Sequence, residues 1–178
     1  MKHLKSNAAF YIPLVIIVVI IIFIVVASFQ NSTSSNSGSK PLMGQDVSVL
    51  SREHVPVKTK TIYNSNPPAA GEHYSVPQDA GIYITPPADG RLVHSLEHGA
   101  IILWYNPNKL SKDQVIQVQT IFKNMPQQKK IMTPRMSLAV PVALSSWGKI
   151  VKMQTIDEKQ IKAFFETNYD RAPEQAPI

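Results

Sequence analysis

The longest run of apolar side chains lies near the beginning of the sequence. Residues 8–29 contain no charged side chain, and as a helix these 22 residues would extend about 33 Å, enough to cross the hydrocarbon core of a membrane. Lys2 and Lys5 precede the run and no acidic residue does, so residues 1–7 are expected in the cytoplasm. The poor cleavage motif Ala27-Ser28-Phe29 favours an uncleaved signal anchor over a signal peptide.

The polar segment that follows has no apolar side chain to bury. Residues 30–40, QNSTSSNSGSK, are typical of a flexible tether. We therefore expect residues 41–178 to form one extracytoplasmic domain, held at the cell membrane by a single span. This part contains 15 of the 18 Lys and Arg and all 12 Asp and Glu, a net charge of +3. The basic residues are dispersed, so nucleic acid is not an expected partner, and the sequence identifies no protein partner.

The apolar residues of the domain follow a strand pattern in some segments and a helical spacing in others. Strand composition marks residues 57–63, 100–105, 138–144 and 149–153, with shorter segments at 81–84 and 130–133. Apolar residues at helical spacing mark 111–124 and 157–169, where Ser111 and Asp157 are suitable N-caps. The order of these segments predicts an α+β domain with a mostly antiparallel sheet and two packed helices.

A long stretch rich in proline and glycine separates the first predicted strand from the strand at 100–105. In residues 64–90, only the segment 81–84 has strand character, and long irregular loops in compact domains are often functional. The residues just after it, 92–98, are ambiguous. Asp89 could cap a short helix that ends at Gly99, but the alternation of apolar residues with His94 and His98 also fits a strand.

Four of the five histidines lie between positions 54 and 98, and this cluster is the chief candidate for chemistry. We hypothesise a metal site made by His73, His94 and His98, with Glu97 or His54 as a further ligand. Imidazole suits several transition metals, and copper or zinc would occupy such a site first. The sequence has no cysteine, which excludes thiolate ligands and disulfides.

The local geometry at residues 94–98 decides whether this hypothesis can hold. On a helix, residues three or four positions apart are neighbours, so His94, Glu97 and His98 could share one ion. In a strand, four residues extend about 13 Å, and one ion could not bridge His94 and His98.

Other functions fit the same residues. In a metal-free binding or assembly module, the histidines and Glu97 would hydrogen-bond each other and the proline-rich loop. An enzyme would use the metal as a Lewis acid, with Glu97 as a base. Residues 94–98 also match the H-x-x-E-H pattern of inverted zinc proteases, but Gly99 and the strand after it cut any helix short.

Four segments together resemble a family of uncharacterised, membrane-anchored prokaryotic proteins, classified as a domain of unknown function. They are Tyr63 with Pro67-Pro68, Gly71 and His73; LVHSLEHG at 92–99; VALSSWG at 142–148; and RAPE at 171–174. The similarity covers roughly residues 50–174, and Ala70 stands where the family more often has Ser. The resemblance implies an anchored extracytoplasmic domain and no particular activity.

Overall fold

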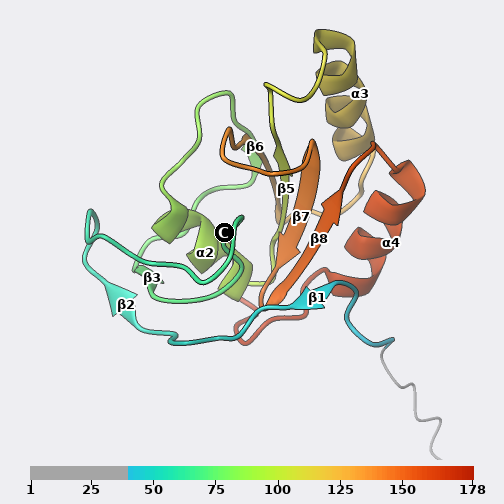
Figure 1. The fold of residues 1–178 in the computed structure, drawn as a ribbon. Coiled ribbons are helices and arrows are strands. Elements are labelled where there is room, and N and C mark those ends of the chain that lie inside the picture. The colour runs from blue at the N-terminus through green and yellow to red at the C-terminus, as the bar shows by residue number, and fades with distance from the viewer. Residues whose placement is uncertain (1–39) are drawn as a thin grey trace, which may run out of the picture. The chain divides into compact units, whose positions relative to one another are not determined.

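The computed structural model describes residues 40–178, and these residues are built around a six-stranded sheet (Figure 1). Its strand order is β1 (Gln45–Asp46), β8 (Lys149–Met153), β7 (Val142–Ser146), β5 (Ile101–Tyr105), β6 (Lys130–Pro134) and β4 (Gly81–Ile82). Neighbouring strands are antiparallel from β1 to β5 and parallel from β5 to β4. Three of these five pairings are antiparallel, so the predicted α+β domain with a mostly antiparallel sheet is confirmed.

β5 lies in the interior of the sheet, and both of its faces are buried. Ile101, Leu103 and Tyr105 belong to one core cluster, whereas Ile102 and Trp104 belong to another. A strand buried on both faces needs apolar residues at every position instead of alternation. This burial explains why IILWY is a continuous apolar run.

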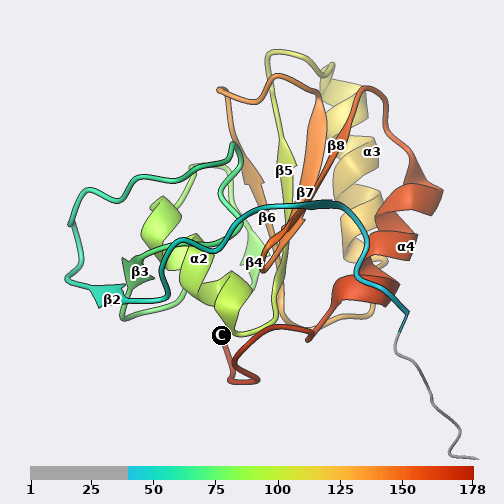
Figure 2. The same cartoon turned by 60° about the horizontal axis from the view of Figure 1, so that its bottom comes forward.

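Two helices cover one face of the sheet, as Figures 1 and 2 show: α3 (Lys112–Lys123) and α4 (Glu158–Asn168). Their apolar sides pack into the cluster that contains the odd-numbered residues of β5. Both predicted N-caps are confirmed, because the side chains of Ser111 and Asp157 each accept a hydrogen bond from the backbone N–H three residues later. The sequence pattern therefore predicted these two helices to within a residue or two at each end.

A third helix, α2 (Asp89–Glu97), packs into the cluster on the opposite face of the sheet. It settles the ambiguity at residues 92–98 in favour of a helix. Residues 40–178 therefore contain three helices, where the sequence predicted two. The helix ends in a Schellman motif: Gly99 N–H donates to Leu96 O, and Ala100 N–H donates to Ser95 O. Gly99 has φ +86°, which glycine adopts at no steric cost.

Asp89 does not cap α2 as predicted. The N-cap position is Ala88, which offers no side-chain hydrogen bond, and Asp89 is the first residue of the helix. The carboxylate of Asp89 instead pairs with Arg135, at 2.7 Å. A distant arginine therefore fixes the orientation of this side chain.

Two predicted strands differ from the structure. Residues 57–63 form no strand, because the chain turns at Lys58 (φ +76°), and Thr59 N–H donates to Pro56 O. The strand predicted at 138–144 begins only at Val142. Pro141 has no N–H to give to a sheet, and its carbonyl accepts from Asn106 before β7 starts. The strands predicted at 100–105, 130–133 and 149–153 are confirmed as β5, β6 and β8, and the one predicted at 81–84 is present as the shorter β4, at residues 81–82.

Residues 40–178 form one compact unit. The predicted cytoplasmic residues 1–7, the predicted span at 8–29 and residues 30–39 of the predicted tether lie outside the described residues. Within residues 40–178, no helix has both the length and the apolar character needed to cross a membrane.

Candidate metal centre

Three elements, β2, β3 and α2, bring the four histidines of the domain together. β2 (His54–Val55) and β3 (His73–Tyr74) form a parallel two-stranded pair in which His54 lies opposite His73. On α2 and its C-cap, His94 and His98 are one turn apart and therefore leave the same side of the helix. Because α2 packs against β3, the two pairs of histidines meet.

Ligand nitrogens of His54, His73 and His94 all lie within 4.8 Å of one another. The ring centroids are 4.7 Å apart for His54 with His73 and for His54 with His94, and 4.9 Å apart for His73 with His94. His73 and His94 are buried, whereas 44% of the His54 side chain is exposed. The three imidazoles could hold one metal ion between them, with His54 on the solvent side.

Three histidines each donate their Nδ1–H to a backbone carbonyl oxygen. These bonds run from His73 to Gly71 (2.8 Å), from His94 to Tyr74 (2.6 Å) and from His98 to Pro177 (2.7 Å). A carbonyl oxygen only accepts hydrogen bonds, so each Nδ1 carries a hydrogen, and in the neutral ring each Nε2 carries a lone pair. Metal-bound histidines are oriented in the same way by hydrogen bonds from the ring nitrogen that does not hold the metal.

The Nε2 atoms of His94 and His98 lie 2.9 Å apart. Two neutral rings would bring their lone pairs together at this distance, an arrangement that a shared proton or a metal ion would stabilise. Burial lowers the pKa of His94 below its usual 6.5, the hydrogen bond to Tyr74 raises this pKa, and the neighbouring His98, His73 and His54 lower it further. The net effect disfavours a proton on His94 and leaves its Nε2 as an electron-pair donor.

Glu97 is buried beside the histidines, with 1% of its side chain exposed. Its Oε1 accepts a hydrogen bond from Arg52 Nε–H at 2.7 Å, and its Oε2 lies 2.8 Å from His73 Nε2 and 3.9 Å from His54 Nε2. No hydrogen bond joins these two atoms across the 2.8 Å, and neither Glu97 Oε2 nor His73 Nε2 has another hydrogen-bond partner. Two buried electron-rich atoms thus face each other, an arrangement that a shared cation would stabilise.

Residues 170–178 close the side of the cluster next to His98. Glu174 N–H donates to Glu97 O at 3.0 Å, and Glu174 Oε2 lies 3.4 Å from His98 Nε2. Lys129 Nζ holds this segment through Asp170 and the carbonyl of Ala176. The sequence pattern gave no sign of a role for Arg52 at the site. Glu174 was singled out only as part of the RAPE segment that resembles the family.

The structure brings all five predicted candidates into one cluster but arranges them differently from the prediction. The group within 4.8 Å consists of His54, His73 and His94, so His54 belongs to it and His98 does not. Glu97 adjoins this group beside His73, and His98 adjoins it beside His94. Glu97 therefore faces His73 and Arg52 and does not stand with His94 and His98 as one H-x-x-E-H unit.

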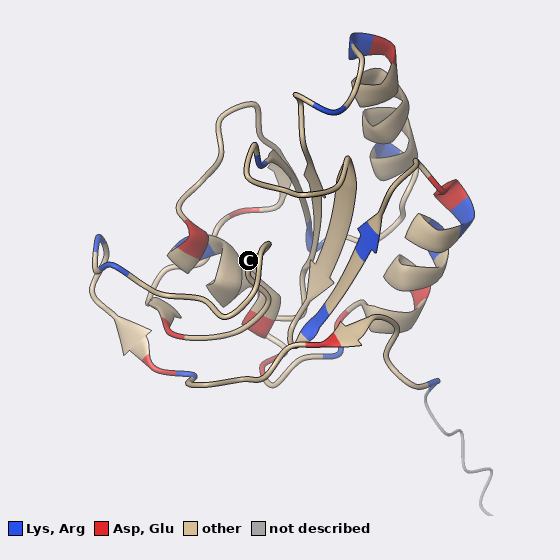
Figure 3. Cartoon of the chain, viewed as in Figure 1, with Lys and Arg blue, Asp and Glu red and all other residues tan. Residues whose placement is uncertain are grey.

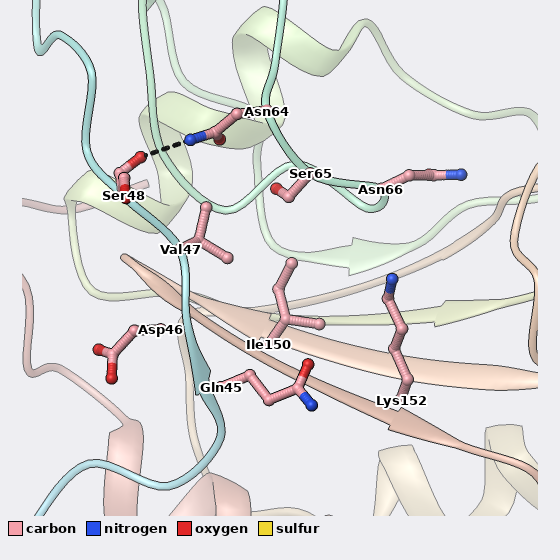
Figure 4. Close-up of a pocket in the computed structure, with 9 residues that line it drawn as sticks. All are labelled: Gln45, Asp46, Val47, Ser48, Asn64, Ser65, Asn66, Ile150 and Lys152. Carbon is pink, nitrogen blue, oxygen red and sulfur yellow. Dashed lines mark hydrogen bonds between the residues drawn. The ribbon is translucent and has the colours of Figure 1, made fainter.

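A separate hollow of about 400 Å³ lies between β1, β8 and the loop at residues 64–66 (Figure 4). Asn64 Nδ2 donates to Ser48 O across one end of it, at 2.9 Å. The charged side chains in its lining are Asp46, which is paired with Lys149, and Lys152. Charged residues elsewhere are likewise scattered over loops, strands and helices (Figure 3). The histidine cluster is therefore the stronger candidate for chemistry.

Comparison with known proteins gives a family and no activity. A family model described as a protein of unknown function (DUF3105) matches residues 54–177. This range includes His54, the other four candidate ligands and the segment up to Pro177 that supports His98. No curated protein and no solved structure matches the chain. Because the family model covers more than half of the sequence, the chain belongs to this family of proteins of unknown function.

Proposed function

We propose that this domain binds one transition-metal ion in its histidine cluster. His54, His73 and His94 would supply the central imidazole nitrogens. Glu97 would add a carboxylate oxygen on the side of His73, and His98 would add or exchange an imidazole on the side of His94.

The observation that carries the proposal is the direction of the lone pairs. Three backbone carbonyls hold the Nδ1–H groups of His73, His94 and His98, so all three Nε2 atoms are available as donors. His73 Nε2 and Glu97 Oε2 are buried without a hydrogen-bond partner, which is costly unless a cation or a proton satisfies them. The 2.8 Å and 2.9 Å separations in the cluster are about 0.5 Å shorter than the roughly 3.3 Å between neighbouring ligands of tetrahedral zinc, so a bound ion would move these atoms slightly apart.

The donor set favours zinc or copper(II). Imidazole and carboxylate suit both ions, and copper(II) binds more tightly than zinc to a given set of such ligands. The sequence has no cysteine, and the buried Met132 belongs to the core cluster under α3 and α4, on the other face of the sheet from α2. Soft sulfur ligands for copper(I) therefore have little support.

We also propose that the metal is held at the external face of a membrane. The support comes from the sequence: the uncharged run at 8–29 and the two lysines that precede it. The exposed edge of His54 would leave the ion accessible to exchange. A role for Glu97 as a general base has less support, because Arg52 already engages its Oε1 and its Oε2 would be a ligand to the proposed ion.

One observation favours the alternative of a metal-free binding or assembly module. Glu174 lies 3.4 Å from His98 Nε2 and could balance a proton there. That proton could be shared with His94 Nε2, which would satisfy the pair without a metal ion. The cluster would then be a structural support for the loop at residues 64–90.

Metal analysis of the purified full chain separates these two functions. After loading with zinc or copper and removal of free metal, we expect about one bound ion per chain. His73→Ala and His94→Ala should each lose most of this metal. His3→Ala is the matched control, since it removes a histidine that is not among the five candidate residues.

Circular dichroism of each variant shows whether it still folds. Sub-stoichiometric metal in the parent chain, unchanged in His73→Ala and His94→Ala, would contradict metal binding and leave the metal-free module as the better function.

A further inference from the structure

None of the residues in the segment 48–62 is buried. It forms the outer loop that carries β2, away from the six-stranded sheet (Figure 1). Its apolar side chains include Leu50, Val57 and Ile62, which are 71%, 49% and 84% exposed. Burial of apolar surface is the main force that holds a segment onto a domain, so this segment is held chiefly by other contacts.

Its backbone contacts with the rest of the domain are few. β2 pairs with β3 over only two residues, and His73 N–H donates to Glu53 O at 3.1 Å. The hydroxyl of Tyr74 donates to Thr59 O, also at 3.1 Å. A strand pair this short is marginal by itself in water. These contacts guide the segment into place but bind it weakly.

The polar contacts that the segment's own side chains make with the rest of the domain lie at the candidate metal centre. Arg52 pairs with the buried Glu97, and the His54 ring stands 4.7 Å from the rings of both His73 and His94. His73 and His94 are fixed by carbonyl hydrogen bonds from the loop and from β3. Of the three grouped imidazoles, His54 is therefore the one whose backbone is weakly held.

Building on the proposed function, we propose that residues 48–62 form a flap that the bound metal ion closes, with His54 as the ligand that joins last and leaves first. An ion that bonds to each nitrogen at about 2.1 Å would join this flap to His73 and His94, the inner ligands. Without the ion, the flap keeps the pairs of Arg52 with Glu97 and Glu174, with an arginine that is 50% exposed. It also keeps the short β2–β3 pair and the hydrogen bonds that the carbonyls of Ser48 and Thr59 accept.

Closure of the flap also creates a surface feature. A groove of about 290 Å³ is lined by Leu50, Lys60 and Ile62 from the flap and by Ala70 and Gly71 from the loop opposite. One wall of this groove belongs to the flap, so the groove depends on the closed state. Metal occupancy would thus control both the access of solvent to the inner ligands and the presence of this groove.

Limited trypsin digestion of the full chain tests the flap, with the cut bonds identified by mass spectrometry. Lys58 and Lys60 are exposed on the flap, and Lys109 is exposed on the turn after β5. Saturating zinc should slow cleavage after Lys58 and Lys60 by about tenfold or more, because a ligand that binds only the closed state shifts the equilibrium towards it. Cleavage after Lys109 should not change and serves as the internal control.

A variant pair isolates the contribution of His54. His54→Ala should still bind zinc through the inner ligands, more weakly, and should lose the protection at Lys58 and Lys60 even at saturating metal. Glu53→Ala is the matched control, because the contact with His73 uses the backbone carbonyl of Glu53. This variant should keep the protection of the parent chain.

The outcomes separate the two proposals. Stoichiometric zinc with unchanged cleavage at Lys58 and Lys60, or protection that survives in His54→Ala, would overturn the flap and leave metal binding intact. If the chain binds no metal at all, the proposed function fails and the flap fails with it.

Discussion

Protonation of His94 is opposed by its surroundings, since the ring is buried and three other histidines stand close to it. Burial is the largest cause that lowers the pKa of His94 below 6.5. In the unfolded chain, the same ring takes up its proton at the usual pKa. Below pH 6.5 the unfolded chain therefore holds more protons than the folded chain, and the free energy of unfolding falls as the pH falls.

We predict that the metal-free protein loses stability as the pH drops through 6.5 towards the lowered pKa of His94. Below that folded-state pKa, this group should cause no further loss. Urea unfolding at a series of pH values, with a chelator present, measures the effect. His94→Gln removes the titrating ring and should flatten the pH dependence in this window. The same slope in the parent chain and in His94→Gln would contradict the assignment.

The residue types at the site could be predicted from the sequence, whereas the roles of their atoms could not. The histidines near the proline-rich loop indicated which part of the chain holds the candidate metal ligands. The choice of Nε2 as the free nitrogen depends on the carbonyls of Gly71 and Tyr74, which lie in or beside β3, and of Pro177, which lies near the end of the chain. Every residue has a carbonyl oxygen, so no residue type at these positions signals such a role.

At the scale of the element, the packing of α2 against β3 sets the position of His94. A Cβ atom at Gly90 in α2 would lie 2.7 Å from the ring of the buried Tyr74, whose carbonyl holds His94. Glycine to alanine within a helix normally stabilises a protein by up to about 1 kcal/mol. Gly90→Ala should instead destabilise it by about 1–3 kcal/mol, because the added methyl group overpacks the contact, and should weaken metal binding as Tyr74 shifts.

Ser111→Ala on α3 gives the contrasting case. It removes the capping box with Gln114 and should cost about 1 kcal/mol of stability. α3 lies on the other face of the sheet from α2, so the metal affinity of this variant should equal that of the parent chain. Thermal unfolding and metal titration of both variants measure the two effects. Equal metal affinities in Gly90→Ala and Ser111→Ala would argue against control of His94 by Tyr74.

Sequence patterns predicted the elements well where apolar burial alone forms them. α3, α4 and β5 have strong apolar periods or runs, and the structure confirms them. α2 was ambiguous because apolar residues and histidines alternate at 92–98, and contacts with β3 and the sheet decide its form. The strand expected at 57–63 failed because strand-forming residues there have no neighbouring strand with which to pair.

At the scale of the whole molecule, segments at the two ends of the described chain meet at the site. Arg52 and His54 approach the inner ligands from one part of the sequence, and Glu174 and Pro177 approach from another. Apolar periodicity cannot predict these contacts, because neither segment forms a long helix or strand. The layered core could be inferred from the sequence, whereas the closure of the site around α2 could not.

The last prediction concerns the placement of the chain in a membrane. The uncharged run at 8–29 is long enough to span a bilayer core, and Lys2 and Lys5 before it favour a cytoplasmic start. We therefore expect protease added outside intact cells to remove the domain at 41–178, aided by the polar segment at 30–40. A cytoplasmic marker protein that stays intact controls for cell lysis. An intact domain under conditions that digest a known external protein would indicate the opposite orientation, and recovery of the domain in the soluble fraction would indicate a cleaved leader.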